Sequence, residues 1–400
     1  MRDTAPAKKA SDRIEFANSL RGIAAVSVVV AHLFEGFWVG QPVVGLLTGM
    51  PTLTIDPPWF ARAFTRVPIS FASFGVALFF VISGFVIAFS LVRYDARAFL
   101  AGRLLRIYPT YWVGFSISVC AVLAGCALAG GVLPFTAVQA GVHYFPPLRA
   151  ILYSKPIDGI IWTLEIELFF YLLCALIAPA ISRGSAKVAG VPFAVFALWI
   201  PVYAFAGHPP AGFEKIAARL EFLAVYMPFL IFMFTGVALN FRQRGLIGRV
   251  GAVLWVCACV AMFLLAWATK LLGPGWKPLF VGVIEPESYL AALTLFVLAM
   301  AGQGAKAGAG ALRPFAALLR WTADISYPLY VVHGLAGFVL LHLLVSRGLG
   351  PGAALGLTLV VVFLAAWLIH AFVEAPTHRI GQRLARKISV RDLQKTAPTS

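Results

Sequence analysis

Charged residues are scarce in this chain of 400 residues. Only 12% of the residues are Asp, Glu, Lys or Arg, whereas 61% are hydrophobic. A soluble domain of this length has too little interior to bury so much apolar surface. Long apolar runs also recur along the whole sequence. The composition therefore excludes an ordinary soluble protein and predicts an integral membrane protein.

Acidic residues are scarcer still, with 16 Asp and Glu against 32 Lys and Arg. On a soluble protein, the net charge of +16 would point to a nucleic-acid partner. Here the basic residues cluster between the apolar runs, which predicts membrane lipids as partners and no nucleic acid. The five cysteines all lie in apolar runs, and none forms a paired metal-binding motif, so we expect no metal.

Ten apolar runs are candidate membrane spans, and most approach the ~20 residues that cross the hydrocarbon layer. They cover residues 18–38, 69–92, 109–131, 159–181, 188–206, 220–241, 250–269, 288–302, 325–345 and 352–373. If the N-terminus is cytoplasmic, most of the Lys and Arg residues fall on the cytoplasmic side. The positive-inside rule and the even number of spans then place both termini in the cytoplasm.

The sequence thus predicts an all-α polytopic membrane protein in three parts. Residues 1–17 form a cytoplasmic N-terminal tail, residues 18–373 a transmembrane domain, and residues 374–400 a basic cytoplasmic tail. Basic residues recur at helical spacing in the last part, which predicts a helix lying on the inner leaflet.

The first run carries ionisable residues into the membrane. Arg21 and His32 are eleven residues apart, so a regular helix places them on one face, separated by roughly 16 Å along its axis. Glu35 follows three residues after His32 and shares that face. Ionisable groups in a membrane usually line a cavity, although a snorkelling arginine and an interhelical histidine hydrogen bond would also fit.

The fourth run contains Glu165 and Glu167 in "WTLEIELFFY". Two residues apart on a helix means about 200° around it, so they cannot face the same cavity. We expect one carboxylate to face the cavity and the other to pack elsewhere or reach the interface. A carboxylate beside an imidazole would orient it and raise its basicity, as a general base requires. A purely structural pair remains the alternative.

Two further motifs carry polar groups. Arg103 and Arg106 share a helical face at the cytoplasmic boundary, where planar guanidinium groups suit bidentate phosphate binding. On the spacing alone, the ordinary positive charge of a cytoplasmic boundary is the favoured explanation. Ser83 precedes Gly84 in mid-membrane, which favours close helix packing over a nucleophilic role.

The ninth run reads "ISYPLYVVHGL". Pro328 is expected to interrupt the helical hydrogen bonds, and His333 lies near mid-membrane. Tyr330 and His333 are neighbours on one helical face. His342 and His370 are isolated, and we expect them to be structural.

The ordered set "RGIAAVSVVVAH", "FFVISGFVI", "RLLRIYP", "WTLEIELFFY", "ISYPLYVVH" and "VEAPTHR" resembles the membrane acyltransferase-3 family, over roughly residues 15–380. The resemblance implies a ten-helix core that acylates sugars and related acceptors. It also implies the stand-alone form, without the extracytoplasmic hydrolase-like domain that some members carry.

The family's motifs map onto particular residues of this chain. The resemblance implies that Arg21 and His32 form its Arg-x10-His motif, and that Arg103 and Arg106 hold the donor's phosphates. Its tryptophan-led motif maps onto Trp162, Leu164 and Glu167, with threonine at 163 where serine is common.

Together these features predict an O-acyltransferase that uses cytosolic acyl-CoA, with acetyl-CoA as the default donor. We expect His32, helped by Glu167 or Glu35, to take the proton from an acceptor hydroxyl as the oxygen attacks the thioester. The acceptor is a carbohydrate, a glycolipid or a small hydroxylated molecule at the outer side of a membrane, by resemblance the bacterial inner membrane. A variant with an acyl-enzyme on His32 or Ser83 remains open.

Other classes of protein stay open at this point. A proton-coupled transporter or a flippase for a glycolipid precursor could use the same polar stripe. A receptor or scaffold would leave that stripe without a purpose. The sequence does not name the acceptor, the acyl group or the oligomeric state.

Overall fold

The computed structural model describes residues 5–152, 154–272, 285–302 and 316–396, in which every regular element is a helix and no strand occurs. The all-α prediction is confirmed for these residues. The elements are α1 (Ala5–Val29), η1 (Val30–Gly36), α2 (Phe37–Val39), α3 (Gln41–Thr48), α4 (Trp59–Phe64), α5 (Phe71–Arg93), α6 (Ala96–Ala129), α7 (Ala137–His143), α8 (Pro146–Ile151), α9 (Ile161–Leu176), α10 (Ala178–Ser182), η2 (Ala186–Gly190), α11 (Val191–Gly207), α12 (Glu214–Gln243), α13 (Arg249–Leu272), α14 (Pro286–Gly302), α16 (Ala316–Asp324), α17 (Ser326–Val332), α18 (Leu335–Ser346), α19 (Pro351–Ile369), η4 (His370–Glu374) and α20 (Ala375–Thr396).

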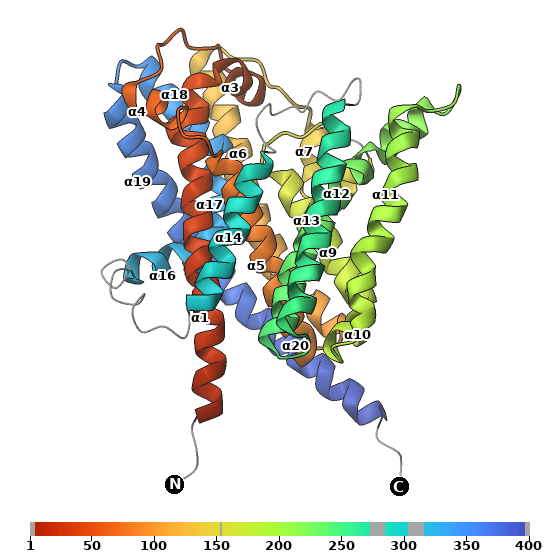
Figure 1. Cartoon of the computed structure of the whole chain (residues 1–400). Helices are drawn as coiled ribbons and strands as arrows, with labels where there is room; N and C mark the ends of the chain where they lie inside the picture. The colour runs from red at the N-terminus through yellow and green to blue at the C-terminus, as the bar shows by residue number, and fades with distance from the viewer. Residues whose placement is uncertain (1–4, 153, 273–284, 303–315, 397–400) are drawn as a thin grey trace.

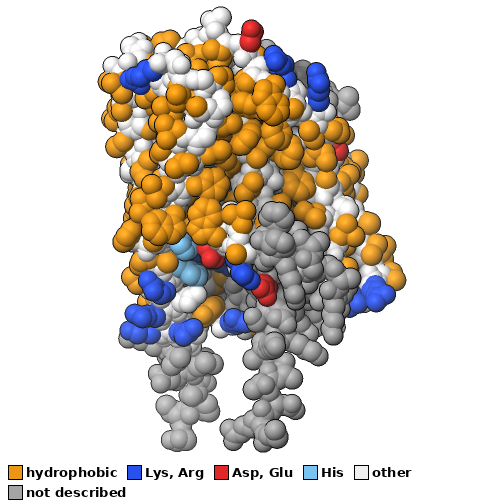
Figure 2. All heavy atoms as spheres, turned by 90° about the vertical axis from the view of Figure 1, so that its left-hand side faces the viewer, with side chains coloured by type: hydrophobic (Ala, Val, Ile, Leu, Met, Phe, Trp, Pro, Cys, Tyr) orange, Lys and Arg blue, Asp and Glu red, His pale blue; other side chains and the backbone are white. Residues whose placement is uncertain are grey.

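Long helices stand roughly side by side and form a bundle (Figure 1). In the described part of the chain, 7 helices are long and apolar enough to cross a membrane, or 8 if the bent pair α17 and α18 is one span. Hydrophobic side chains cover the middle of the face shown in Figure 2, and Lys and Arg gather toward its two ends. This pattern is that of an integral membrane protein.

Each of the ten predicted runs is helical over most of its length, but not every one qualifies as a span. Helix α9 has 16 residues and α14 has 17, which is short for a crossing. Helices α17 and α18 meet at 55°. The count of ten therefore stays a prediction.

Two helices differ from the sequence expectation. Helix α6 begins thirteen residues before the predicted span, because Asp95 caps it by accepting hydrogen bonds from the backbone N–H groups of Arg97 and Ala98. Pro109 consequently lies inside this helix. Pro328 does not break the ninth run, because it sits in the first turn of α17, where a missing N–H costs little. The bend falls instead after His333.

Glycines let the central helices approach closely. A methyl group on Gly84 of α5 would lie 2.0 Å from the carbonyl oxygen of Met233 on α12, and one on Gly236 of α12 would lie 2.2 Å from the carbonyl oxygen of Val81. Helix α5 also packs against α1, where Gly75 faces the backbone of Ala24. These contacts fix the position of α5, which carries Ser83, relative to its neighbours.

Both chain ends lie at the same end of the bundle, which we call the terminus end (Figure 1). Helix α20 crosses this end, where its Gly381 packs on Gly102 of α6. The basic side chains of Arg379, Arg383 and Arg386 are exposed. The helix thus has the amphipathic form expected of an interfacial segment. The other predicted cytoplasmic basic residues that precede residue 15 or lie between 303 and 316 are outside the described side chains.

Candidate active site

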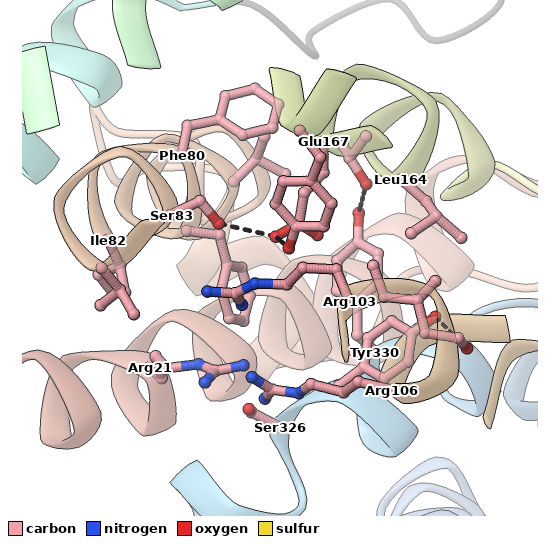
Figure 3. A pocket seen from close by; sticks show the side chains of 17 residues that line it. Arg21, Phe80, Ile82, Ser83, Arg103, Arg106, Leu164, Glu167, Ser326 and Tyr330 are labelled. Atoms are coloured by element: carbon pink, nitrogen blue, oxygen red, sulfur yellow. Dashed lines mark hydrogen bonds between the residues drawn. The ribbon is translucent and has the colours of Figure 1, made fainter. Parts of the chain in front are cut away.

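A cavity of about 90 Å³ lies where α1, α5, α6, α9 and α17 meet. Its polar walls combine two kinds of group. Arginine side chains come from α1 and α6, while hydroxyl and carboxylate groups come from α5, α9 and α17. Figure 3 shows these side chains pointing into one space. The cavity brings together residues that lie more than 300 positions apart in the sequence.

Three guanidinium groups converge on the cavity, from Arg21, Arg103 and Arg106. Arg103 is held by a hydrogen bond of 3.0 Å to the hydroxyl of Ser90 and lies 5.3 Å from the ring centre of Tyr171. Arg106 forms an ion pair of 3.5 Å with Glu374. The guanidinium groups of Arg21 and Arg106 point toward one another in Figure 3.

Arg21 differs from the other two arginines. Within the described part of the chain it makes no hydrogen bond or ion pair, although it is half-buried in an apolar bundle. Three cations so close together repel one another, and nearby carboxylates offset this only partly. The arrangement is one that an anion with several oxygen atoms would stabilise.

Glu167 is the carboxylate that faces the cavity. It accepts a hydrogen bond of 2.8 Å from the hydroxyl of Ser83 and another from the hydroxyl of Tyr171. Ser83 also lines the cavity, while the neighbouring Gly84 makes the close helix contact with Met233.

Glu165 points elsewhere, as the two-residue spacing predicts. It is fully buried and forms a bidentate ion pair with Arg149 of α8, and it also accepts a hydrogen bond from Tyr226 of α12. This ion pair joins α9 to α8, and the Tyr226 hydrogen bond joins α9 to α12; none of these three residues lines the cavity.

His32 lies outside the residues that line the cavity, and its partner is His333. The Nδ1 atom of His32 is 2.8 Å from Nε2 of His333, and the two rings stack with centres 5.0 Å apart. In the described part of the chain the imidazole of His333, not Glu167 or Glu35, is the hydrogen-bond partner of His32, so the carboxylate partner stays a prediction. His32 lies in η1, which continues α1, and His333 follows the last residue of α17. The sequence does not show that these two elements pack together.

The local helix geometry changes the expected placement of Glu35 relative to His32. Residues Val30–Gly36 form a π-helical segment, η1, in which the hydrogen bonds run from i to i+5. Each residue then turns by less than the 100° of an α-helix, so three residues no longer return to the same face. Glu35 has no hydrogen bond or ion pair in the described part of the chain. Such π-segments recur at functional sites.

Tyr330 connects the cavity to the histidine pair. Its hydroxyl is 2.6 Å from the Thr163 hydroxyl, it lines the cavity, and its ring centre is 5.7 Å from that of His333. Trp162 does not line the cavity but packs against Phe80 and Phe229, which anchors the start of α9. Of these two neighbours, Thr163 thus supplies a hydroxyl group to the cavity wall, and Trp162 packs in the surrounding apolar core.

Two residues of the site escaped the sequence argument. Tyr171 stands four residues after Glu167, and this i, i+4 spacing on α9 was the available signal. Glu374 forms an ion pair of 3.5 Å with Arg106 and lies 2.9 Å from Nδ1 of His370, within hydrogen-bond distance. Its only signal was its place in "VEAPTHR", because a contact between the α6 and η4 helices cannot be deduced from either segment alone.

Comparison with known families identifies the chain. The family model described as acyltransferase domain, acyltransferase 3, matches residues 14–371. The chain belongs to this family. This membership favours a membrane acyltransferase over the transporter and scaffold alternatives.

Individual relatives of this acyltransferase match it over shorter stretches. Nodulation protein 10 of Rhizobium leguminosarum bv. viciae is 31% identical over 169 residues, covering 38% of this chain and 41% of the relative. The exopolysaccharide production protein ExoZ of Rhizobium meliloti (strain 1021) is 35% identical over 109 residues, covering 25% of this chain and 32% of the relative. The chain thus spans less than half the length of these curated relatives. No solved structure matches it significantly.

Proposed function

We propose that this acyltransferase moves an acyl group, acetyl by default, from acyl-CoA to a hydroxyl group of a carbohydrate or glycolipid acceptor. The acyl-CoA enters from the terminus end, which we assign to the cytoplasm. The acceptor approaches from the opposite side of the membrane, which we take to be a bacterial inner membrane. This assignment includes ten spans, with residues 18–373 as the transmembrane domain between two cytoplasmic tails.

One observation carries the proposal: three arginines converge on a single cavity, and Arg21 has no partner there among the described residues. Coenzyme A carries several phosphate groups, and guanidinium groups bind phosphate in bidentate fashion. The cavity lies beside the part of α6 that α20 covers at the terminus end. The donor's phosphates therefore fit at Arg21, Arg103 and Arg106, with its thioester arm extending along Tyr330 toward the histidine pair.

The chemistry follows from the groups beyond the arginines. His32 takes the proton of the acceptor hydroxyl as its oxygen attacks the thioester carbonyl carbon. The tetrahedral intermediate then expels the thiolate, which recovers the proton from His32. An ester and free coenzyme A result. The names of both relatives concern bacterial nodulation or exopolysaccharide production, which supports a carbohydrate acceptor.

A donor-binding experiment tests the assignment of the cavity. Acetyl-CoA would be titrated into the purified protein in lipid nanodiscs by calorimetry. Replacing Arg103 with glutamine removes charge-assisted hydrogen bonds worth about 1.5–3 kcal/mol, so the Kd should rise by roughly 10- to 150-fold. Arg97→Gln is the matched control, because Arg97 is exposed on the same helix and should leave the Kd unchanged.

Two results would contradict the proposal. One is the absence of acetyl-CoA binding by the wild type together with binding of other acyl donors that lack phosphate. The other is an equal effect of Arg103→Gln and Arg97→Gln, which would indicate a general surface attraction rather than a built phosphate site.

A further inference from the structure

The hydrogen bonds of His333 fix which of its nitrogens carries the proton. His333 is fully buried, and its Nδ1 atom lies 2.9 Å from the backbone carbonyl oxygen of Leu329. A carbonyl oxygen only accepts, so Nδ1 of His333 must donate. A buried imidazole without a carboxylate beside it is neutral, which leaves Nε2 of His333 as an acceptor.

This arrangement determines the protonation of His32 in turn. Its Nδ1 atom faces Nε2 of His333 at 2.8 Å, so His32 donates from Nδ1. In a neutral imidazole the other nitrogen, Nε2, then carries the free electron pair. His32 is only partly buried, whereas His333 is not exposed at all. The more accessible member of the pair, His32, is therefore the one whose free nitrogen can take a proton.

We infer that His333 is a positioning residue for His32, a conclusion that rests on the proposed acyl transfer. The chain from the Leu329 carbonyl through His333 holds His32 in the tautomer whose Nε2 is the base. When Nε2 takes the hydroxyl proton, His32 becomes a cation, and the proton on its Nδ1 is shared with Nε2 of His333. The proton on Nε2 passes to the departing thiolate, and both rings return to their starting state.

The fold supports this role through the end of α17. His333 directly follows the last residue of α17, and the 55° bend into α18 comes immediately after it. The ring of Phe338, on α18, meets the His32 ring edge-on at 6.1 Å, so the bend closes an apolar wall on that side. An uncharged partner suits such a place, because a carboxylate would carry a full charge into it.

Three variants separate this role from a structural one. His333→Asn keeps a donor for the Leu329 carbonyl near the Nδ1 position but removes the acceptor that faces His32. His333→Gln places an amide oxygen near the Nε2 position and keeps that acceptor. His342→Gln is the control, because His342 lies on α18 and, among the described residues, its hydrogen bond is to the Pro51 carbonyl, 2.7 Å from its Nε2. For each protein we would measure kcat for coenzyme A release, and the Kd for acetyl-CoA.

The inference predicts a separation of kcat from binding. His333→Asn should lower kcat by about 100-fold, while the Kd for acetyl-CoA stays within about twofold. This is the upper end of the loss of activity seen when a histidine that acts in a site loses the hydrogen-bond partner that orients it. His333→Gln should keep kcat within about tenfold of the wild type, and His342→Gln should match the wild type.

Other outcomes would overturn the inference. Equal kcat values for His333→Asn and His333→Gln would show that the acceptor facing His32 does not matter. A loss of kcat accompanied by a loss of acetyl-CoA binding would show a structural role. Absence of coenzyme A release from the wild type would instead contradict the proposed function, so the two failures are distinguishable.

Discussion

The buried ion pair between Arg149 and Glu165 gives a quantitative test of how the site helices are held together. The Glu165 side chain is not exposed, and that of Arg149 is only 9% exposed. Arg149 also donates to the Ser154 carbonyl at 2.7 Å and to the Tyr226 hydroxyl at 3.0 Å. All three guanidinium nitrogens of Arg149 therefore donate hydrogen bonds, and α8, α9 and α12 meet at this side chain.

Replacing Arg149 with methionine keeps much of the side-chain volume but leaves the Glu165 charge buried without compensation. Breaking a buried pair in this way typically costs 3–5 kcal/mol. With the unfolding entropy per residue of globular proteins, that loss corresponds to a decrease in Tm of roughly 4–6 °C for a chain of this length. Thermal unfolding in a mild detergent, followed by tryptophan fluorescence, would measure it.

Removing the second charge should restore most of the loss. In Arg149→Met/Glu165→Gln no buried charge remains, and the glutamine oxygen still accepts from Tyr226, so Tm should return to within about 1–2 °C of the wild type. Arg66→Met, at an exposed arginine, controls for the loss of a cation. A double variant less stable than Arg149→Met would refute the reasoning, because it would show that the buried charge was not the cause.

Two further substitutions test the packing and the electrostatics of the cavity. Gly84→Ala would place a methyl group 2.0 Å from the Met233 carbonyl oxygen, so we expect the free energy of unfolding to fall by about 1–3 kcal/mol. In the control Gly102→Ala, the nearest neighbour lies 3.8 Å from the added methyl group, so stability should be unchanged or higher. Equal Tm values for the two variants would show that α5 and α12 separate freely. Glu374→Gln removes a carboxylate 3.5 Å from Arg106 and should tighten acetyl-CoA binding about fivefold, by roughly 1 kcal/mol. Weaker binding by calorimetry would show that Glu374 chiefly holds Arg106 in place.

Local patterns predicted the helices well, because apolar runs of helical length have one stable form in a membrane. The arginine pair at 103 and 106 and the opposed directions of Glu165 and Glu167 also followed from helical spacing alone. These features depend only on residues a few positions apart, and a single helix fixes them.

Features that depend on tertiary packing were not predictable. The His32–His333 contact joins residues 301 positions apart, and nothing in either segment specifies the other. The π-helical segment around His32 was not predicted either, and it changes the angular spacing between His32 and Glu35 from that of an α-helix. Helix α6 begins before the apolar run at 109–131, because Asp95 caps it there.

The central claim is that His32 is the base in a transfer from acyl-CoA, and single-turnover chemistry in vesicles tests it most directly. Purified protein would be reconstituted with a candidate glycan enclosed and radiolabelled acetyl-CoA supplied on the side of the chain termini. We predict free coenzyme A and acetylated glycan with the wild type, and neither with His32→Gln, which should still bind acetyl-CoA with an unchanged Kd. Equal product from His32→Gln and the wild type would contradict the account.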